Sequence, residues 1–181
     1  MNNSLIIQTQ HYPILLDVNA GEALNDFLSK KNYSRVFVLM DENTYSNCYP
    51  ILSSDSQKLS EAELLVIEPG EENKSIEIAS QLWGSLTKGK ADRHSLLINL
   101  GGGLISDLGG FIASTFKRGM DFLNIPTSLL AMVDASIGGK TGINFGNFKN
   151  QIGLFSTPEN SVNRLSFFKY IAFRTNFISL C

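Results

Sequence analysis

Glycines and hydrogen-bonding side chains are concentrated in one part of the sequence, residues 101–153. There an apolar run, residues 96–100, leads into Gly101-Gly102-Gly103 and then into a segment with helical spacing. Glycines let backbone N–H groups approach a phosphate closely, and a helix N-terminus adds partial positive charge, so this order of elements favours a pyrophosphate. A tight strand-to-helix turn would also need glycines, and these residues alone leave both interpretations open.

Two polar residues qualify this glycine motif. Ser106 stands where the third glycine of the dinucleotide-binding fingerprint G-x-G-x-x-G would be, so the fingerprint is incomplete. Asp107 is expected in the first turn of the following helix, where a carboxylate either serves a ligand or stabilises the helix dipole. The glycine loop is therefore a candidate phosphate site that needs support from elsewhere in the chain.

A second candidate site lies between Pro126 and Asn150. Its Gly-Gly-Lys-Thr segment resembles the end of a phosphate-binding P-loop, but Asp134 replaces the first glycine of G-x-x-x-x-G-K-[ST], which disfavours an NTPase. Arg118, Lys140 and Lys149 could together bind a phosphate or a carboxylate. Taken singly, each of these cations is more often a solvated surface charge.

A third candidate is the loop at residues 69–75, which follows the apolar run 63–67. Open α/β sheets bind ligands at the carboxyl ends of their strands, so this loop could contact a ligand. The alternative, which these residues alone favour, is a turn and helix start with acidic side chains in the first turn.

Composition excludes several classes of function. The 15 basic and 17 acidic side chains give a formal charge of −2, with no basic excess for binding nucleic acid. No apolar run approaches the ~18 residues of a membrane span, and residues 1–4 lack the basic start of a signal peptide. His11, His94, Cys48 and Cys181 are too far apart for a zinc or redox motif. We expect a cytoplasmic protein without nucleic-acid or membrane partners.

The elements that must position these residues alternate along the chain. Segments with helical spacing, residues 75–88 and 104–116, lie between short apolar runs. This alternation predicts an α/β fold, a Rossmann-like parallel sheet with flanking helices, and residues 5–18 are expected to form an edge strand or hairpin. With 181 residues, one domain is expected. The predicted strands are residues 35–40, 63–67, 95–100 and 122–125.

Taken together, the motifs resemble the amino-terminal domain of the 3-dehydroquinate synthase family. Those enzymes use NAD and zinc in the shikimate pathway, to convert 3-deoxy-D-arabino-heptulosonate 7-phosphate to 3-dehydroquinate and phosphate. The resemblance implies an NAD-dependent lyase in which NAD is regenerated at each turnover. It is carried by Pro69-Gly70-Glu71 with Lys74-Ser75, residues 101–108 with Gly110-Phe111, residues 116–119, residues 125–144 and residues 149–153.

The resemblance also implies roles for individual residues. Ser128 stands where family members usually have a threonine, and it keeps the hydroxyl group. Arg118 is implied to reach the substrate phosphate, either in its own chain or in a neighbouring subunit. The implied cofactor-binding residues are Asp41, Gly70, Glu71, Lys74, Gly102, Gly103, Leu104, Ile105, Ser106, Asp107, Thr127, Ser128, Lys140 and Lys149. The implied catalytic and substrate-binding residues are Asp134, Lys140, Asn150, Arg118 and Lys149.

The resemblance ends near Pro158, so we expect an NAD-binding domain at residues 1–158 and a divergent tail at residues 159–181. In the family, a helical carboxy-terminal domain supplies the zinc ligands, and the full-length enzyme is a homodimer. We expect that domain to be absent, and the chain alone to lack bound zinc and synthase activity. The tail could be a frameshifted end or an amphipathic helix. The alternative functions are a catalytically inactive NAD-binding module and a related sugar-phosphate cyclase.

Overall fold

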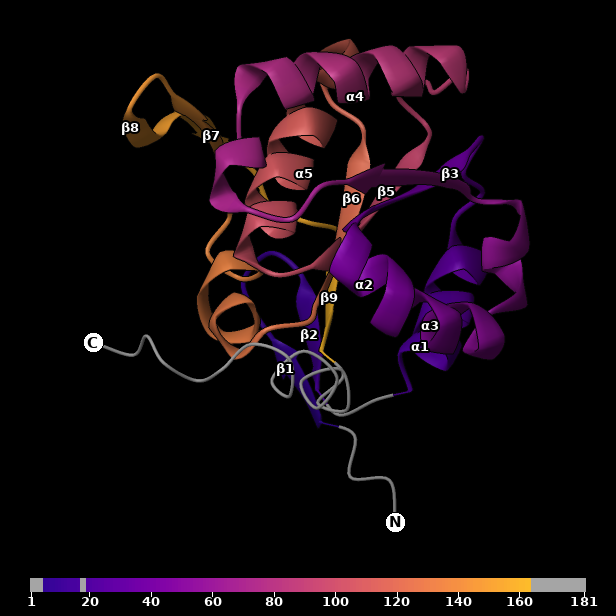
Figure 1. Ribbon diagram of the computed structural model, residues 1–181. Helices are drawn as coiled ribbons and strands as arrows, with labels where there is room; N and C mark the ends of the chain where they lie inside the picture. Colours follow the sequence, from indigo (N-terminus) through magenta and orange to yellow (C-terminus); the bar gives the residue numbers. More distant parts are fainter. Residues whose placement is uncertain (1–4, 17–18, 164–181) are drawn as a thin grey trace.

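The computed structural model describes residues 5–16 and 19–163 and shows the expected α/β architecture (Figure 1). The main sheet has seven strands in the order β1-β2-β9-β6-β5-β3-β4. The β1–β2 pair is antiparallel and every other neighbouring pair is parallel, which confirms the Rossmann-like sheet and the N-terminal hairpin. The strands are β1 (Leu5–Gln8), β2 (Pro13–Leu16), β3 (Val36–Asp41), β4 (Glu63–Ile67), β5 (Leu96–Gly101), β6 (Asp121–Pro126) and β9 (Asn160–Asn163).

Helices cover both faces of this sheet (Figure 1). Helices α4 (Ile76–Lys88) and α5 (Gly103–Thr115) pack on one face, as the apolar spacing predicts. Helices α1 (Ala20–Lys30), α2 (Glu42–Asn47) and α3 (Tyr49–Asp55) lie on the other. Short segments complete the chain: the 3₁₀ turns η1 (Gln57–Glu61), η2 (Glu71–Asn73) and η3 (Phe116–Arg118), and the π-helical turn η4 (Ala131–Ala135).

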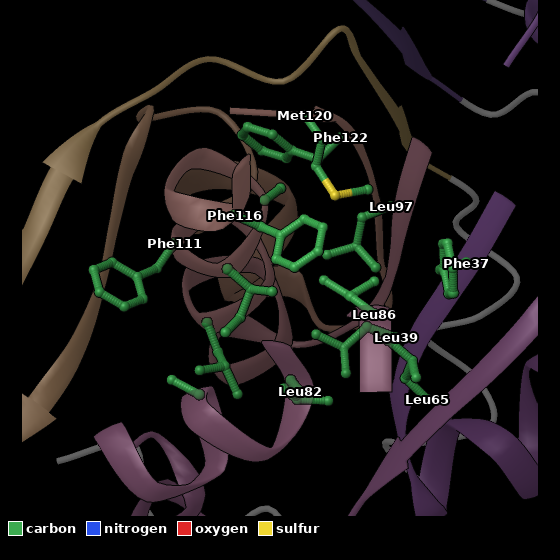
Figure 2. Close-up of a cluster of buried hydrophobic side chains, with 14 of the residues drawn as sticks. Phe37, Leu39, Leu65, Leu82, Leu86, Leu97, Phe111, Phe116, Met120 and Phe122 are labelled. Atoms are coloured by element: carbon green, nitrogen blue, oxygen red, sulfur yellow. The ribbon is translucent and has the colours of Figure 1, made fainter. Parts of the chain in front are cut away.

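The central strand β5 explains why the apolar runs are continuous rather than alternating. All six of its residues are buried, because helices cover it on both faces. Leu97 points into the cluster beneath α4 and α5, which Figure 2 shows with Phe37 and Phe116, whereas Ile98 points into the cluster on the α1 side. The sheet is therefore held by apolar packing on both sides.

Glycines in α5 allow this helix to approach its neighbours closely. A Cβ atom at Gly109 would lie 1.9 Å from Asn99 Oδ1, and one at Gly110 would lie 2.4 Å from Thr141 Cγ2. Neither position has room for a side chain. The glycine pair therefore fixes α5 against β5 and against a hairpin that contains Thr141 and lies further along the chain.

This hairpin is separate from the main sheet and consists of β7 (Lys140–Phe145) and β8 (Phe148–Phe155). The two strands are antiparallel, and in Figure 1 the hairpin projects to one side of the body, beyond α5. The side chain of Ile143 is fully buried in the core cluster beneath α4 and α5. Most of β8, in contrast, is exposed.

The chain returns to the main sheet at β9, two residues after the boundary expected at Pro158. This strand lies between β2 and β6, and all four of its residues are buried. A C-terminal helix is therefore wrong for residues 160–163, since strand pairing on both sides overrides the local pattern. The rest of the expected tail, residues 164–181, lies outside the described residues.

Candidate functional site

Loops from four neighbouring parallel strands meet at the carboxyl edge of the main sheet. These loops follow β3, β4, β5 and β6. Asp41 is the last residue of β3, Gly70 lies in the loop after β4, Gly102 directly follows β5 and Thr127 directly follows β6. Ligands of open α/β sheets bind at this edge, so the topology brings the separate sequence motifs to one place.

The three glycines between β5 and α5 differ in what surrounds them. A Cβ atom at Gly101 would lie 2.5 Å from Ile105 Cγ1, so this glycine is required by packing. At Gly102 and Gly103 the nearest atoms would be 3.4 Å and 3.8 Å away, which is ordinary contact. Nothing within the described chain requires glycine at these two positions. They leave the backbone at the start of α5 open to an incoming group.

Hydroxyl groups lie close to this glycine loop. The side-chain oxygens of Thr127 and Ser106 are buried and have no hydrogen-bond partner among the described residues. Buried polar atoms are usually paired, so an unpaired one calls for an explanation such as an absent ligand. Ser128 Oγ accepts a hydrogen bond from the Ala131 N–H at 3.3 Å, which leaves the Ser128 hydroxyl proton available.

Two of the expected cofactor-binding residues have structural roles in this chain. Asp41 caps helix α2, and its Oδ1 accepts hydrogen bonds from the Thr44 N–H at 2.8 Å and the Thr44 hydroxyl at 3.0 Å. The side chain of Ile105 is fully buried in the core. Asp41 therefore has its second carboxylate oxygen left for a ligand, and Ile105 could contribute only its backbone.

A buried lysine connects three of the sequence motifs. Lys74, whose side chain is 3% exposed, places Nζ 2.5 Å from Asp107 Oδ2 and 2.6 Å from Asn150 Oδ1. Glu71 Oε1 lies 4.0 Å from the same ammonium group. The lysine comes from the loop after β4, the aspartate from α5 and the asparagine from β8, so this contact joins the two candidate sites.

The position of Asp107 differs from the prediction. Helix α5 begins at Gly103, so Asp107 is its fifth residue and lies beyond the first turn, where the helix dipole acts. Its partner is the Lys74 ammonium group instead. Burial raises the pKa of the Asp107 carboxyl above its ordinary value, and the hydrogen bond from Lys74 opposes this rise without cancelling it.

A pocket of about 520 Å³ opens between α5, the loop after η4 and the β7–β8 hairpin. It brings together the predicted residues Asp107, Asp134, Lys140 and Asn150. The ammonium group of Lys140 and the carboxamide of Asn150, with these two carboxylates, can orient a small polar ligand by charge and hydrogen bonding. Part of the wall is backbone at glycines, including Gly138.

Buried polar side chains hold residues 136–137, which lie between the pocket residues Ala135 and Gly138. Asn99 Nδ2 donates to Asn124 Oδ1 at 2.9 Å, and Asn124 Nδ2 donates to the Ser136 carbonyl at 3.3 Å. The Tyr12 hydroxyl donates to the Ile137 carbonyl at 2.7 Å. These residues are not among those predicted from the sequence. An asparagine inside each of two apolar runs was the available signal.

Of the predicted catalytic and substrate-binding residues, Lys149 and Arg118 lie outside the pocket. Lys149 is exposed on β8, and the lining of the pocket does not include it. Arg118 precedes β6, whereas Thr127 follows it, and Arg118 lines two other pockets. Its backbone is left-handed, with φ of 71°, as is that of Lys117 with φ of 51°. Two consecutive non-glycine residues in this region are strained, which is common at functional sites.

The described residues offer no site that fits the zinc of the family. Within residues 5–16 and 19–163, no group of three or more His, Cys, Asp or Glu side chains is arranged to hold a metal ion. In the same residues no helix is long and apolar enough to cross a membrane.

The sequences of known proteins to which this chain is similar point to one family. The model of the 3-dehydroquinate synthase N-terminal domain matches residues 64–176. The 3-dehydroquinate synthase of Parabacteroides distasonis is 50% identical over 135 residues, which cover 75% of this chain and 38% of that protein. The chain spans less than half the length of the curated relatives it matches.

Solved structures with the same fold include two sugar-phosphate cyclases. A 2-deoxy-scyllo-inosose synthase complexed with carbaglucose-6-phosphate, NAD⁺ and Co²⁺ has a TM-score of 0.82 at 19% identity, covering 91% of this chain and 46% of that one. A 2-epi-5-epi-valiolone synthase from Streptomyces hygroscopicus, with NAD⁺ and Zn²⁺ bound, has a TM-score of 0.75 at 27% identity, covering 89% and 45%. The family match over more than half of the sequence confirms the resemblance, and the chain belongs to the 3-dehydroquinate synthase family, in which it corresponds to the amino-terminal domain.

Proposed function

We propose that this chain provides the NAD-binding side and part of the substrate-binding side of a 3-dehydroquinate synthase. The observation that carries the proposal is the unobstructed backbone at Gly102 and Gly103, beside the unpaired hydroxyl of Thr127. Backbone N–H groups at a helix start, with a hydroxyl donor nearby, suit a pyrophosphate. The comparisons support it, because both cyclase structures contain NAD⁺.

Each loop of the carboxyl edge would hold a different part of NAD. Gly102, Gly103 and Thr127 would bind the pyrophosphate and adjacent groups, and the free oxygen of Asp41 would accept a hydrogen bond from a ribose hydroxyl. Lys74, beside Asp107, would face the cofactor from within the site. Once bound, NAD would accept a hydride from the substrate and return it within the same turnover.

The pocket beside α5 would hold 3-deoxy-D-arabino-heptulosonate 7-phosphate. Lys140 and Asn150 line it, and a cation with an amide donor suits the carboxylate and phosphate of this substrate. Asp134 would accept hydrogen bonds from the sugar hydroxyls. Arg118 lies outside this pocket in its own chain, so its contact with the phosphate would occur in a neighbouring copy.

Calorimetric titration with NAD tests the proposal directly. In Gly103→Val, the added side chain would fill the space above the helix start, and we expect NAD affinity to fall at least tenfold. Gly84→Val is a matched control, because a Cβ atom at Gly84 meets nothing within 4 Å and the residue lies in α4. A folded Gly103→Val protein with unchanged NAD affinity would show that the glycine loop is not the cofactor site.

Activity distinguishes the leading proposal from its alternatives. A synthase assay on this chain, with and without a separately supplied carboxy-terminal domain of a relative, measures release of phosphate from the substrate. NAD binding without phosphate release under both conditions would favour the inactive NAD-binding module. Release from a different sugar phosphate only would favour a related cyclase.

A further inference from the structure

The β7–β8 hairpin contains an irregularity at the residues expected to face the substrate. Ile143 pairs with Ile152 and Phe145 pairs with Phe148. Three residues of β8, Lys149, Asn150 and Gln151, therefore stand opposite the single residue Asn144 of β7. Bulges of this kind bend a strand and redirect its side chains, and they are frequent beside active sites.

Asn150, in the middle of this bulge, has an uncommon backbone conformation. Its φ is 52°, in the left-handed region that asparagine enters more readily than most residues. This conformation turns the Asn150 carboxamide toward Lys74, with Oδ1 2.6 Å from Nζ. Asn144 Oδ1 accepts a hydrogen bond from the Asn150 N–H at 2.9 Å, so a side chain replaces the ladder bond that the bulge removes.

The same Asn144 side chain also contacts the cofactor side. Its Nδ2 donates to the Glu71 carbonyl at 3.2 Å and to Glu71 Oε1 at 3.3 Å. Its backbone N–H donates to the Lys74 carbonyl at 2.7 Å. The oxygen of this carboxamide is therefore hydrogen-bonded to the bulge of the hairpin, and its nitrogen is hydrogen-bonded to the loop after β4.

We propose that Asn144 is a positioning residue that holds the Asn150 bulge and ties the hairpin to the loop at residues 70–74. The coupling part of this inference rests on the proposed NAD site, because Glu71 and Lys74 are then cofactor contacts. A cofactor that orders this loop would also order the hairpin, since the free energy of the Asn144 contacts is shared between them. Binding of NAD would thus reduce the motion of the hairpin strands that carry Lys140 and Asn150 before the substrate binds.

Two substitutions separate the functions of this carboxamide. Asn144→Ala removes the side-chain hydrogen bonds to the bulge and to Glu71 and leaves the backbone hydrogen bond to Lys74 in place. Asn144→Asp keeps an oxygen for the Asn150 N–H but replaces the donor toward Glu71 by a second carboxylate, which repels it. Asn147→Ala is the matched control, because Asn147 is an exposed asparagine in the turn of the same hairpin.

Amide hydrogen exchange of the hairpin, measured with and without NAD on the whole chain, tests the inference. Without NAD, we expect exchange at residues 149–151 to be about tenfold faster in Asn144→Ala, and close to wild type in Asn144→Asp and Asn147→Ala. With NAD, we expect exchange to slow in the wild type and Asn147→Ala, and this slowing to be smaller in both Asn144 variants, in which only the backbone hydrogen bond to Lys74 still joins residue 144 to the loop.

The outcomes distinguish this inference from the proposed function. Absence of NAD binding in the wild type would contradict the proposed function, and the exchange without NAD would still test the bulge. Wild-type exchange in Asn144→Ala would overturn the positioning role. NAD binding that leaves the hairpin exchange of the wild type unchanged would overturn the coupling. If Asn144→Ala fails to fold, Asn144→Asp provides the test, and a slowing by NAD equal to that of the wild type would overturn the coupling.

Discussion

Strands β5 and β8 both contribute to the candidate site but are held in place by different forces. All six residues of β5 are buried, with apolar side chains from helices on both faces. In β8, seven of eight residues are exposed and Leu154 is half-buried. Apolar burial therefore fixes the glycine loop at the end of β5, whereas polar contacts such as that of Thr141 Oγ1 with the Leu154 carbonyl, at 3.0 Å, hold β8.

Because of this difference, we expect the glycine loop and the hairpin to differ in how easily they change conformation. A glycine loop at the end of a buried strand keeps its shape, because any movement would disturb the core. A hairpin held by a few hydrogen bonds can adjust at low cost, since each such bond contributes only about 0.5–1.5 kcal/mol net. The pocket of Lys140 and Asn150 lies where the rigid part and the adjustable part meet.

The largest difference between the two regions should appear when one phenylalanine in each is replaced by alanine. Phe37 is fully buried in the sheet, and Phe148 on β8 is 68% exposed. We expect Phe37→Ala to lower the free energy of unfolding by about 3–5 kcal/mol, and Phe148→Ala to change it by less than about 0.5 kcal/mol. Denaturation with guanidinium measures both, and equal losses would show that the hairpin is also held by apolar packing.

The glycine loop offers a sharper comparison within one turn. A Cβ atom at Gly101 would collide with Ile105, so Gly101→Ala should lower the free energy of unfolding by about 1–3 kcal/mol. Gly103→Ala should be neutral or slightly stabilising, because its Cβ atom has room and helices prefer alanine to glycine. Thermal unfolding of the two variants tests this, and a similar loss in both would contradict the division between packing and ligand glycines.

A smaller effect is expected where the N-terminal hairpin supports the pocket. Tyr12→Phe removes the hydrogen bond from the hydroxyl to the Ile137 carbonyl and should lower the free energy of unfolding by about 0.5–1.5 kcal/mol. Tyr45→Phe is the control, since Tyr45 is 46% exposed on α2. No difference between the two variants in chemical denaturation would mean that the Tyr12 hydroxyl does not contribute.

The smallest effect is the pH dependence contributed by Asp107. Its pKa is raised by burial above the ordinary value of 3.8, so the folded state binds the proton more tightly than the unfolded state. Stability from this group is present below that value and is lost as pH rises through the folded-state pKa. The unfolding free energy of the wild type minus that of Asp107→Asn should therefore decline with rising pH. If this value instead increases with pH, the contact with Lys74 lowers the pKa of Asp107 by more than burial raises it.

The sequence alone predicted the elements whose patterns are local. Continuous apolar runs identified β3 to β6, and helical spacing identified α4 and α5, because each pattern lies within one element. The order of strand, glycine loop and helix likewise indicated where a phosphate could bind. The resemblance to the family added the roles of individual residues, which no local pattern contains.

Only the tertiary structure decided how these motifs meet. Lys74 contacts Asp107, 33 residues away, and Asn150, 76 residues away, and nothing in its neighbourhood along the chain indicates that its ammonium group is buried. The bulge opposite Asn144 depends on the register between β7 and β8, and the insertion of β9 between β2 and β6 depends on strand order. Such features arise from pairing between distant segments, whose free energy depends on the whole fold and leaves no periodic trace in the sequence.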